Sequence, residues 1–318
     1  MSTPAEDSKS RDFVAIVIPC YRSAETVGIL ADRLVAVLSQ RDCVFQLIFV
    51  DDASPDGTWS ALEAIKVKLH ERALCIRLAR NVGQHAAIIC GMAAIATAAT
   101  QVVTMDDDLQ HRPEDVPLLL DALQTHDIAI AAFDERKNER WKNIGGRLVD
   151  GTLRRLFGLQ RSFQLTSFRA FRRFVCDEVT QQPAMYIYIT SSILAASNSV
   201  VNVPVQWQSR VVGVSGYNYV KSISLALNLI FNYSRVPYIF IILIWAVSFL
   251  FTLYVTLSVI ILRILTDEVI PGWSSVMVMI GLQGTLMMSI SAVLLIYVAR
   301  SHRILSQTKA RYRVADRL

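Results

Sequence analysis

Short apolar runs bounded by turn residues recur along roughly the first 130 residues of the chain. Runs of about four to eight apolar residues are typical of buried strands. Between them, apolar residues return at the spacing of a helix face, as in residues 24–38 and 86–99. This alternation predicts an α/β domain of three layers around a mostly parallel sheet. The expected strands are residues 13–19, 45–50, 73–78, 102–106 and 128–132.

A different pattern begins near residue 236, where two long apolar runs replace the short ones. The first, 236–262, carries no charge, and the second, 269–298, is entered through a proline and a tryptophan. At about 1.5 Å per residue, each run spans a hydrocarbon core of about 30 Å as a helix. The residues after 299 are strongly basic. The positive-inside rule therefore predicts a transmembrane hairpin with this tail and the N-terminal domain in the cytoplasm.

The region between these two patterns mixes apolar and basic residues. Residues 141–157 and 221–233 have the pattern of amphipathic helices, and 199–207 has that of a strand. A basic amphipathic helix is typical of a segment that lies on a membrane surface. An ordinary surface helix of the globular domain gives the same pattern, and the sequence leaves both interpretations open.

Composition narrows the class of protein. The chain has 318 residues, of which 53% are hydrophobic, and a mean hydropathy of +0.38, too apolar for a purely soluble enzyme. The net charge of +5 suits lipid headgroups and phosphorylated substrates better than nucleic acid, for which there is no motif. The five cysteines form no C-x-x-C pair, which indicates buried thiols in a reducing compartment. The polar residues 1–12 contain no apolar core, so no signal peptide is expected.

The fourth expected strand runs directly into Asp106, Asp107 and Asp108. In extended chain, Asp106 and Asp108 point to the same side. Two adjacent carboxylates suit magnesium or manganese bound together with substrate phosphates. Taken alone, the stretch also fits a solvated turn before a helix that begins at Pro113. The second expected strand ends in carboxylates as well, and ligands of α/β sheets bind beyond the carboxyl ends of strands.

Four short motifs follow one another over about the first 115 residues. They are I-P-C-Y at 18–21, V-D-D-A-S-P-D-G-T at 50–58, R-N-V-G-Q-H at 80–85 and D-D-D-L-Q-H-R-P-E at 106–114. In this order they resemble family 2 glycosyltransferases. Within that family, the D-x-D followed by L-Q and then by P-E resembles the motif of the polyprenyl-phosphate glycosyltransferases. These include dolichol-phosphate mannose synthases and bacterial undecaprenyl-phosphate sugar transferases. The resemblance implies a GT-A fold, which is Rossmann-like with a mostly parallel sheet.

The resemblance also implies roles for residues on the donor side. The D-x-D and the following glutamine hold a magnesium or manganese ion and the donor, whereas Asp107 occupies the variable middle position and points away. One of the two acids that end the second strand contacts base and ribose. The family usually has Y-N-E where this chain has Tyr21-Arg22-Ser23, which leaves the base preference open. The implied residues are Asp106, Asp108 and Gln110 for the metal, and Pro19, Tyr21, Asp51 and Asp52 for the nucleotide.

Arginines are the candidates for the sugar and acceptor sides, because a guanidinium grips phosphate oxygens bidentately. Arg80 and Asn81 lie near the expected sugar position, unless they only form a helix-capping turn. A family stretch R-x-x-G-x-S-x-Y matches Arg210, Ser215 and Tyr217. The candidates for the acceptor phosphate are Arg136, Arg140, Arg210, Ser215 and Tyr217, and a solvated salt bridge is the alternative for each arginine.

A second departure lies at Gln164 and Ser167, where relatives carry an acidic residue that is sometimes credited as catalytic. His85 and His111 are candidate bases or ligands, although polar loop histidines fit as well. Gln283 within the second apolar run, between Gly281 and Gly284, favours a homo-oligomer, and the resemblance implies a tetramer.

The predicted protein is an integral inner (plasma) membrane enzyme with both termini cytoplasmic. It moves one sugar, with inversion, from a UDP-sugar to undecaprenyl phosphate. A GDP-sugar donor, another lipid acceptor and a non-catalytic membrane scaffold stay open. A chain-extending synthase is disfavoured because the Q-x-x-R-W motif is missing.

The expected division of the chain follows from these patterns. Residues 1–12 form a disordered lead-in, and 13–140 form the nucleotide-sugar-binding GT-A domain. Residues 141–235 form the acceptor-side region with its amphipathic helices. The transmembrane hairpin occupies 236–299, and 300–318 form the basic cytoplasmic tail.

Overall fold

The computed structural model describes residues 12–133, 151, 153–155, 157–181, 189–206, 208, 236–265, 272–305 and 312–318. The chain forms two compact units. The first comprises residues 1–226 and 309–318, and the second comprises residues 227–308. The chain therefore leaves the first unit, builds the second, and returns to the first for its last residues.

The first unit is built on one sheet, in which eight strands of the described residues have the order β7-β5-β6-β4-β1-β2-β3-β8. Strands β1 to β4 are parallel, β6 runs antiparallel between β4 and β5, and β7 is parallel to β5. At the far edge β8 is antiparallel to β3. The strands are β1 Asp12–Cys20, β2 Cys43–Asp51, β3 Ala73–Leu78, β4 Gln101–Thr104, β5 Ile128–Phe133, β6 Arg169–Arg172, β7 Val200–Val205 and β8 Val314–Arg317.

Strand β1 is the centre of this sheet. It pairs with β2 from Asp12↔Cys43 to Cys20↔Asp51, and with β4 on its other side as far as Val17↔Thr104. Its residues from 14 to 20 are all buried. Such continuous apolar runs occur where a parallel strand is covered on both faces.

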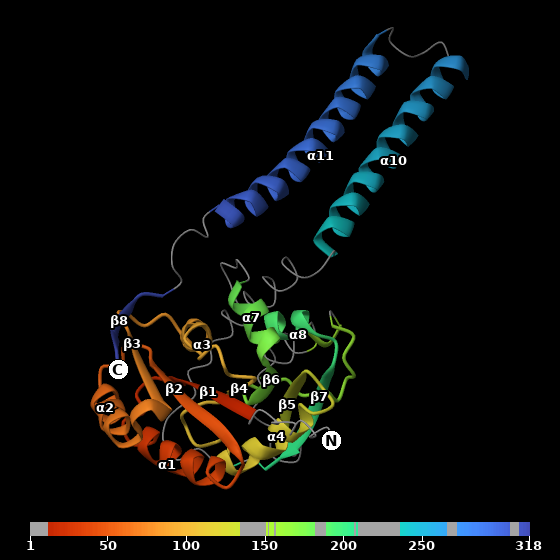
Figure 1. The fold of residues 1–318 in the computed structure, drawn as a ribbon. Helices are drawn as coiled ribbons and strands as arrows, with labels where there is room; N and C mark the ends of the chain where they lie inside the picture. The colour runs from red at the N-terminus through yellow and green to blue at the C-terminus, as the bar shows by residue number, and fades with distance from the viewer. Residues whose placement is uncertain are drawn as a thin grey trace, which may run out of the picture. The chain divides into compact units, whose positions relative to one another are not determined.

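Helices cover both faces of the sheet (Figure 1). Those on one face pack on the core that contains Ile16 and Phe49, and those on the other pack on the core that contains Val17 and Val50. The first face carries α1 (Val27–Leu38), α2 (Thr58–Leu69) and α4 (Val116–Ala122), with the short helices η1 (His70–Arg72) and η2 (Pro113–Asp115) beside α2 and α4. The second face carries α3 (Gln84–Ala93), α7 (Arg173–Gln181) and α8 (Ile189–Ala196).

The predicted three-layer α/β architecture is confirmed, and each of the five strands expected in the first 133 residues is present. The helix expected over 86–99 is shorter and begins earlier, at Gln84. The short strands β6 and β8 and the helices α7 and α8 were not predicted. The sheet thus takes strands from beyond residue 140 and from the end of the basic 300–318 segment.

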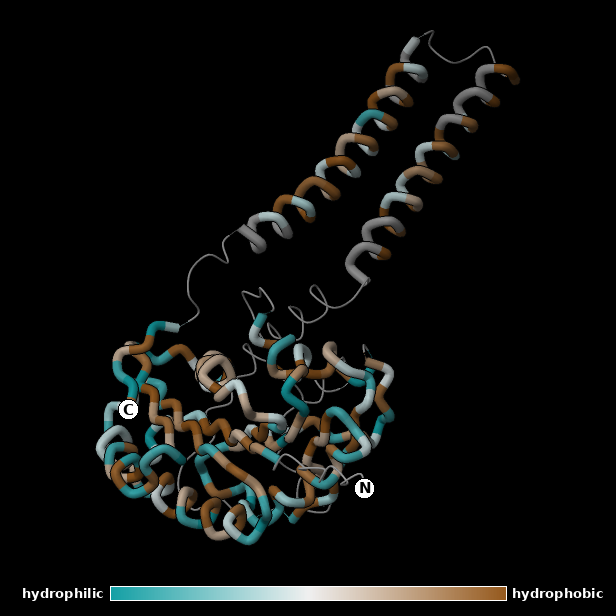
Figure 2. Tube along the Cα trace, viewed as in Figure 1, coloured by the Kyte–Doolittle hydropathy of each residue, from teal (hydrophilic) through white to brown (hydrophobic). Residues whose placement is uncertain are grey.

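The second unit contains two long helices, α10 (Val236–Leu265) and α11 (Trp273–Leu305), in which apolar residues predominate with a few polar ones among them (Figure 2). They contact each other, with the hydroxyl oxygens of Thr252 and Thr285 3.3 Å apart. By length and composition, one segment of the described residues, Val278–Val298, is able to cross a membrane, and Leu243–Val255 is a shorter apolar stretch. Both predicted apolar runs are therefore helical, and the second crossing stays a prediction.

Candidate active site

Three loops meet at the carboxyl edge of the parallel strands: those that follow β1, β2 and β4. Hydrogen bonds join them, from the Tyr21 backbone N–H to Asp107 Oδ2 at 3.1 Å and from the Arg22 N–H to Ser54 Oγ at 3.1 Å. Strand β1 lies where the strand order turns, with β2 on one side and β4 on the other. Ligands of open α/β sheets bind at such a switch point, so the sheet topology itself marks this edge as the candidate site.

Each of the three loops holds one non-glycine residue in the left-handed region. They are Arg22 with φ 58°, Ala53 with φ 54° and Leu109 with φ 61°. This conformation costs on the order of 1 kcal/mol or more per residue and persists only where the surroundings impose it. Strained residues of this kind gather at functional sites, which supports the assignment of this edge.

Asp106 is held from three directions. Its Oδ1 accepts a hydrogen bond from the side-chain amide of Gln84 at 2.6 Å, and its Oδ2 accepts one from the Ser167 hydroxyl at 2.7 Å. Its backbone N–H donates to Nδ1 of His111 at 3.0 Å. The His111 ring is buried and stacks on Phe133 and Phe168, with centroids 5.9 and 5.0 Å away. The carboxylate is thus fixed in orientation before any ligand arrives.

The next two acids make different contacts. Asp107 turns to the loop after β1, where its Oδ2 accepts hydrogen bonds from the Tyr21 N–H and the Ser23 hydroxyl. Burial, opposed by these two hydrogen bonds, raises the pKa of Asp107 to about 6. Asp108 Oδ1 accepts the Gln110 N–H at 3.1 Å and so closes its own turn. All three acids are partly exposed, but the hydrogen bonds of Asp107 join two loops.

The donor set of this loop fits a hard divalent cation that also contacts a substrate. No three His, Cys, Asp or Glu side chains gather into a metal cluster within the described residues. Magnesium and manganese are commonly held by one or two carboxylates together with substrate phosphates. Asp106, Asp108 and the amide oxygen of Gln110 are ligands of that kind.

Asp51 and Asp52 are neighbours with separate tasks. Asp52 accepts the backbone N–H groups of Val82 at 2.7 Å and Gly83 at 2.8 Å, so it holds the loop after β3. Gly83 has φ 91°, which a residue with a Cβ rarely adopts. Asp51 is fully buried, and its Oδ2 lies 3.5 Å from Nε of Arg77. Sequence reasoning left the choice between the two acids open, and their contacts separate them.

The other predicted donor-side residues differ in accessibility. Pro19 is a buried residue of β1 paired with Val50. Tyr21 is 44% exposed, with the Arg22 guanidinium 5.4 Å from its ring centroid. Arg80 and Asn81 are exposed and directly precede the loop that Asp52 holds. Tyr21, Arg80 and Asn81 are therefore free to meet a ligand, whereas Pro19 shapes the strand beneath it.

Gln164 and Ser167, which occupy positions where the resemblance implied an acid, both have structural partners. The Gln164 amide donates to the Phe133 carbonyl at 2.8 Å and accepts the Phe133 N–H at 3.0 Å, which extends the pairing at the end of β5. Ser167 contacts Asp106, as described above. The predicted acceptor-phosphate residues Arg136, Arg140, Arg210, Ser215 and Tyr217 lie outside the described residues.

Four contact residues of this site were not predicted to hold the acids of the D-x-D, although His111 was a candidate base or ligand. They hold Asp106 or Asp107 in place and do not themselves belong to the D-x-D. Their partners in the chain are between 5 and 84 residues away, so only the fold reveals them. Gln84 is part of the R-N-V-G-Q-H motif, but the motif does not indicate that Asp106 is its partner. They are Ser23, Gln84, His111 and Ser167.

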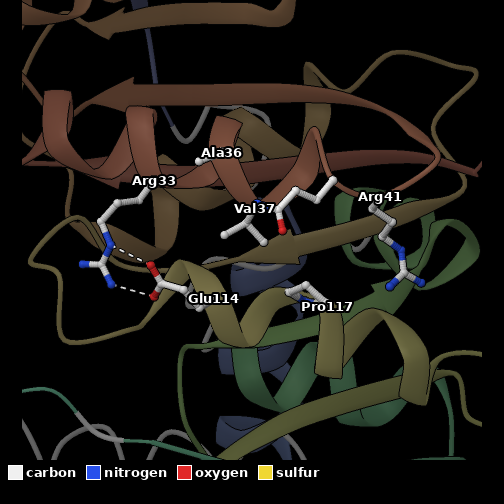
Figure 3. Close-up of a pocket in the computed structure, with 7 residues that line it drawn as sticks. Arg33, Ala36, Val37, Arg41, Glu114 and Pro117 are labelled. Atoms are coloured by element: carbon white, nitrogen blue, oxygen red, sulfur yellow. Dashed lines mark hydrogen bonds and ion pairs between the residues drawn. The ribbon is translucent and has the colours of Figure 1, made fainter.

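A separate groove of about 550 Å³ lies between α1 and the η2–α4 segment (Figure 3). Its arginines are already paired, Arg33 with Glu114 at 2.6 Å and Arg41 with Asp121 at 2.7 Å. Its lining contains none of the predicted site residues. The groove therefore adds nothing to the acidic site.

Comparison with known proteins identifies the family. Residues 15–180 match the sequence profile described as Glycosyl transferase family 2. This chain belongs to glycosyl transferase family 2. The GT-A fold that the motifs implied is confirmed, and the enzyme class is glycosyltransferase.

Relatives and solved structures agree with this assignment. The undecaprenyl-phosphate 4-deoxy-4-formamido-L-arabinose transferase of Sodalis glossinidius (strain morsitans) is 28% identical over 238 residues, which cover 74% of this chain and 71% of that protein. The protein of the same name from Pseudomonas syringae pv. syringae is 29% identical over 71% of this chain and 66% of its own length. Glucosyl-3-phosphoglycerate synthase of Mycobacterium tuberculosis, in complex with phosphoglyceric acid, matches with a TM-score of 0.50 at 17% identity, over 70% of this chain and 78% of its own.

Proposed function

We propose that this glycosyltransferase moves a single sugar from a UDP-sugar to undecaprenyl phosphate, or a similar polyprenyl phosphate, at the cytoplasmic face of the inner (plasma) membrane. The observation that carries the proposal is the preset carboxylate of Asp106 at the switch point of the sheet, beside Asp108. The relatives named above, which are undecaprenyl-phosphate sugar transferases, supply the acceptor class.

On the donor side, Asp106, Asp108 and Gln110 would hold magnesium or manganese. When bound, the ion supplies positive charge for the departing diphosphate. Asp52 keeps Arg80 and Asn81 in place beside the sugar by fixing the loop that follows them. A UDP donor is supported by the same mycobacterial synthase, which was solved with Mn²⁺, UDP and phosphoglyceric acid (TM-score 0.50, 16% identity).

On the acceptor side, the nucleophile is a phosphate monoester, whose second pKa is about 6. It is largely dianionic at neutral pH and needs no general base, unlike a sugar hydroxyl. This explains how the chain functions with Gln164 and Ser167 where relatives carry an acid, and it implies direct displacement with inversion at the anomeric carbon. We assign Arg136, Arg140, Arg210, Ser215 and Tyr217 to the acceptor phosphate, because transfer to an anion requires positive charge around it.

The connectivity of the chain supports a membrane hairpin with both ends on one side. Strand β7, which precedes α10 in the chain, and strand β8, which follows α11, belong to the same unit, and β8 pairs with β3. The number of membrane crossings between them is therefore even. The segment Val278–Val298 in α11 is long and apolar enough to cross a membrane. An even number then requires a second crossing, and we assign it to α10, which precedes α11 in the chain. A homotetramer, with Gly281 and Gly284 at a helix interface, completes the proposal.

The test uses the full-length enzyme purified in detergent with undecaprenyl phosphate. Radiolabelled UDP-sugars and GDP-sugars are supplied in turn with Mn²⁺, and label that enters the lipid extract is counted. We expect transfer from a UDP-sugar that EDTA abolishes and added Mn²⁺ restores, with Asp106→Asn as the inactive control. Transfer that survives EDTA would contradict the metal assignment, transfer only from a GDP-sugar would contradict the donor, and label found only in free sugar would contradict the lipid acceptor.

A further inference from the structure

A buried cation lies behind the acidic loop. Arg169 in β6 is 1% exposed and faces Thr104 across the antiparallel β4–β6 pair. Its Nε donates to Thr104 Oγ1 at 3.3 Å, and its Nη1 donates to Thr190 Oγ1 on α8 at 2.9 Å. A buried guanidinium is tolerated only where hydrogen bonds and nearby negative charge compensate the loss of water. The three carboxylates begin two residues after Thr104.

The hydrogen bonds continue from this cation to Asp106. The Thr104 hydroxyl donates to the Ser167 carbonyl at 3.0 Å, and the Ser167 hydroxyl donates to Asp106 Oδ2 at 2.7 Å. Each hydroxyl has one proton to donate and lone pairs to accept with. Arginine only donates, so the Thr104 hydroxyl accepts from Arg169 and donates to the Ser167 carbonyl. The Ser167 hydroxyl donates to the carboxylate, which only accepts, and the covalent structure of Ser167 joins the two sets of hydrogen bonds. Ser167 is therefore held at its carbonyl by Thr104 and holds Asp106 with its hydroxyl.

The charge of Arg169 also acts on the opposite side of the site. His85 follows Gln84, the residue that holds the other oxygen of Asp106. Burial and, secondly, the positive charge of Arg169 lower the pKa of His85 to about 4. The imidazole is therefore neutral at neutral pH, whereas the Arg169 guanidinium carries its positive charge.

We infer that Arg169 is a positioning residue for sugar transfer, which sets the carboxylate of Asp106 for a divalent cation through Thr104 and Ser167. Its action on the metal ligand runs through these two hydroxyl residues, and it is not itself proposed to touch the substrate. The inference rests on the proposed function, because it assigns a supporting structure to the metal ligand proposed there. It gives Ser167 a role that differs from that of an acid at the same position: a hydroxyl donates to Asp106, whereas a carboxylate would repel it.

Replacing Arg169 itself endangers folding, so the test removes single hydroxyls along the path. Thr104→Val keeps the shape of the side chain and loses the hydroxyl, Thr104→Ser restores the hydroxyl, and Ser167→Ala removes the last donor. Thr166→Val is the matched control, because the Thr166 hydroxyl is one residue away but donates to the Ala131 carbonyl at 2.8 Å. Mn²⁺ binding in the presence of UDP is measured by electron paramagnetic resonance on the full-length protein in detergent, together with the thermal midpoint.

We expect Ser167→Ala to weaken Mn²⁺ binding about tenfold, the usual effect of one lost hydrogen bond to a charged group. Thr104→Val, which acts on Asp106 only through Ser167, should weaken it by up to the same factor. Thr104→Ser should bind like the wild type, and Thr166→Val should lower the thermal midpoint without changing Mn²⁺ affinity. Wild-type affinity in both hydroxyl-deletion variants would overturn the inference and leave the proposed function standing, as would an equal loss in Thr166→Val. A wild-type chain that binds no Mn²⁺ with UDP would overturn the proposed function and the inference with it.

Discussion

His85 gives this protein a pH-dependent stability that a single substitution removes. The residue lies in the first turn of α3, and burial followed by the charge of Arg169 lowers its pKa from 6.5 to about 4. The unfolded chain takes up a proton near pH 6.5, whereas the folded chain resists it until about pH 4. The folded state therefore binds fewer protons, and its stability falls as the pH drops through this window.

The size of the effect follows from the two pKa values. The difference between 6.5 and about 4 is worth about 3 kcal/mol when the pH has passed below both values. At pH 5 about 2 kcal/mol of it is already lost, because the unfolded chain is mostly protonated there and the folded chain is not. Above pH 7 the contribution is complete and no longer changes.

The substitution His85→Gln keeps a polar side chain that does not titrate. The thermal midpoints of wild type and variant are measured in detergent at pH 8 and at pH 5. The fall in midpoint between the two pH values is then compared between the proteins, so that the contributions of the titratable groups common to both cancel. We expect the wild type to lose about 2 kcal/mol more than the variant, or about 4–8 °C for a domain of this size. His70→Gln, at an exposed position, is the matched control and should behave as the wild type does. Equal drops in wild type and His85→Gln would refute the reasoning.

Three further predictions concern other parts of the first unit. Asp106→Asn or Asp108→Asn should lower kcat by orders of magnitude while the protein stays folded, and Asp107→Asn should lower kcat much less. Equal losses of kcat in all three variants would contradict the assignment of the metal ligands. Deleting residues 312–318 removes β8 and exposes the edge of β3, so the thermal midpoint should fall and aggregation on heating should increase. An unchanged thermal midpoint would mean that β8 adds no stability. Gly91→Ala puts a Cβ into the space of a Val17 methyl on β1 and 3.1 Å from a Val50 methyl on β2. Overpacking of this kind costs about 1–3 kcal/mol, so the thermal midpoint should fall, and a midpoint equal to that of the wild type would show that α3 moves freely.

The sequence by itself determined the strands of the central sheet and the family. Each of β1, β2, β3 and β5 is a mostly apolar run, because a strand covered on both faces has little room for polar side chains. The two long apolar runs became helices of 30 and 33 residues, since their composition allows little else at that length. The order of the four motifs was enough for the resemblance to family 2, because their residues are local in sequence.

Tertiary structure alone decided the short strands and the partners within the site. Strand β6 has four residues, Arg169–Arg172, and exists as a strand because β4 and β5 lie on either side of it. Strand β8 is exposed along its length, so its sequence has no hydrophobic pattern that predicts a strand. It forms because the edge of β3 supplies its hydrogen bonds. A side chain finds its partner only when the backbone brings the two together.

The same reason explains the acidic site. From the sequence, Asp106 and Asp108 were candidate ligands by their spacing, while Asp51 and Asp52 were indistinguishable. The carboxylate of Asp106 is set by residues 22 and 61 positions away, and Asp52 differs from Asp51 because it accepts backbone N–H groups 30 and 31 positions away. Strand order and helix packing bring these distant residues into contact. The local sequence pattern therefore determined which residues carry the chemistry, and the fold determined how each of them is held.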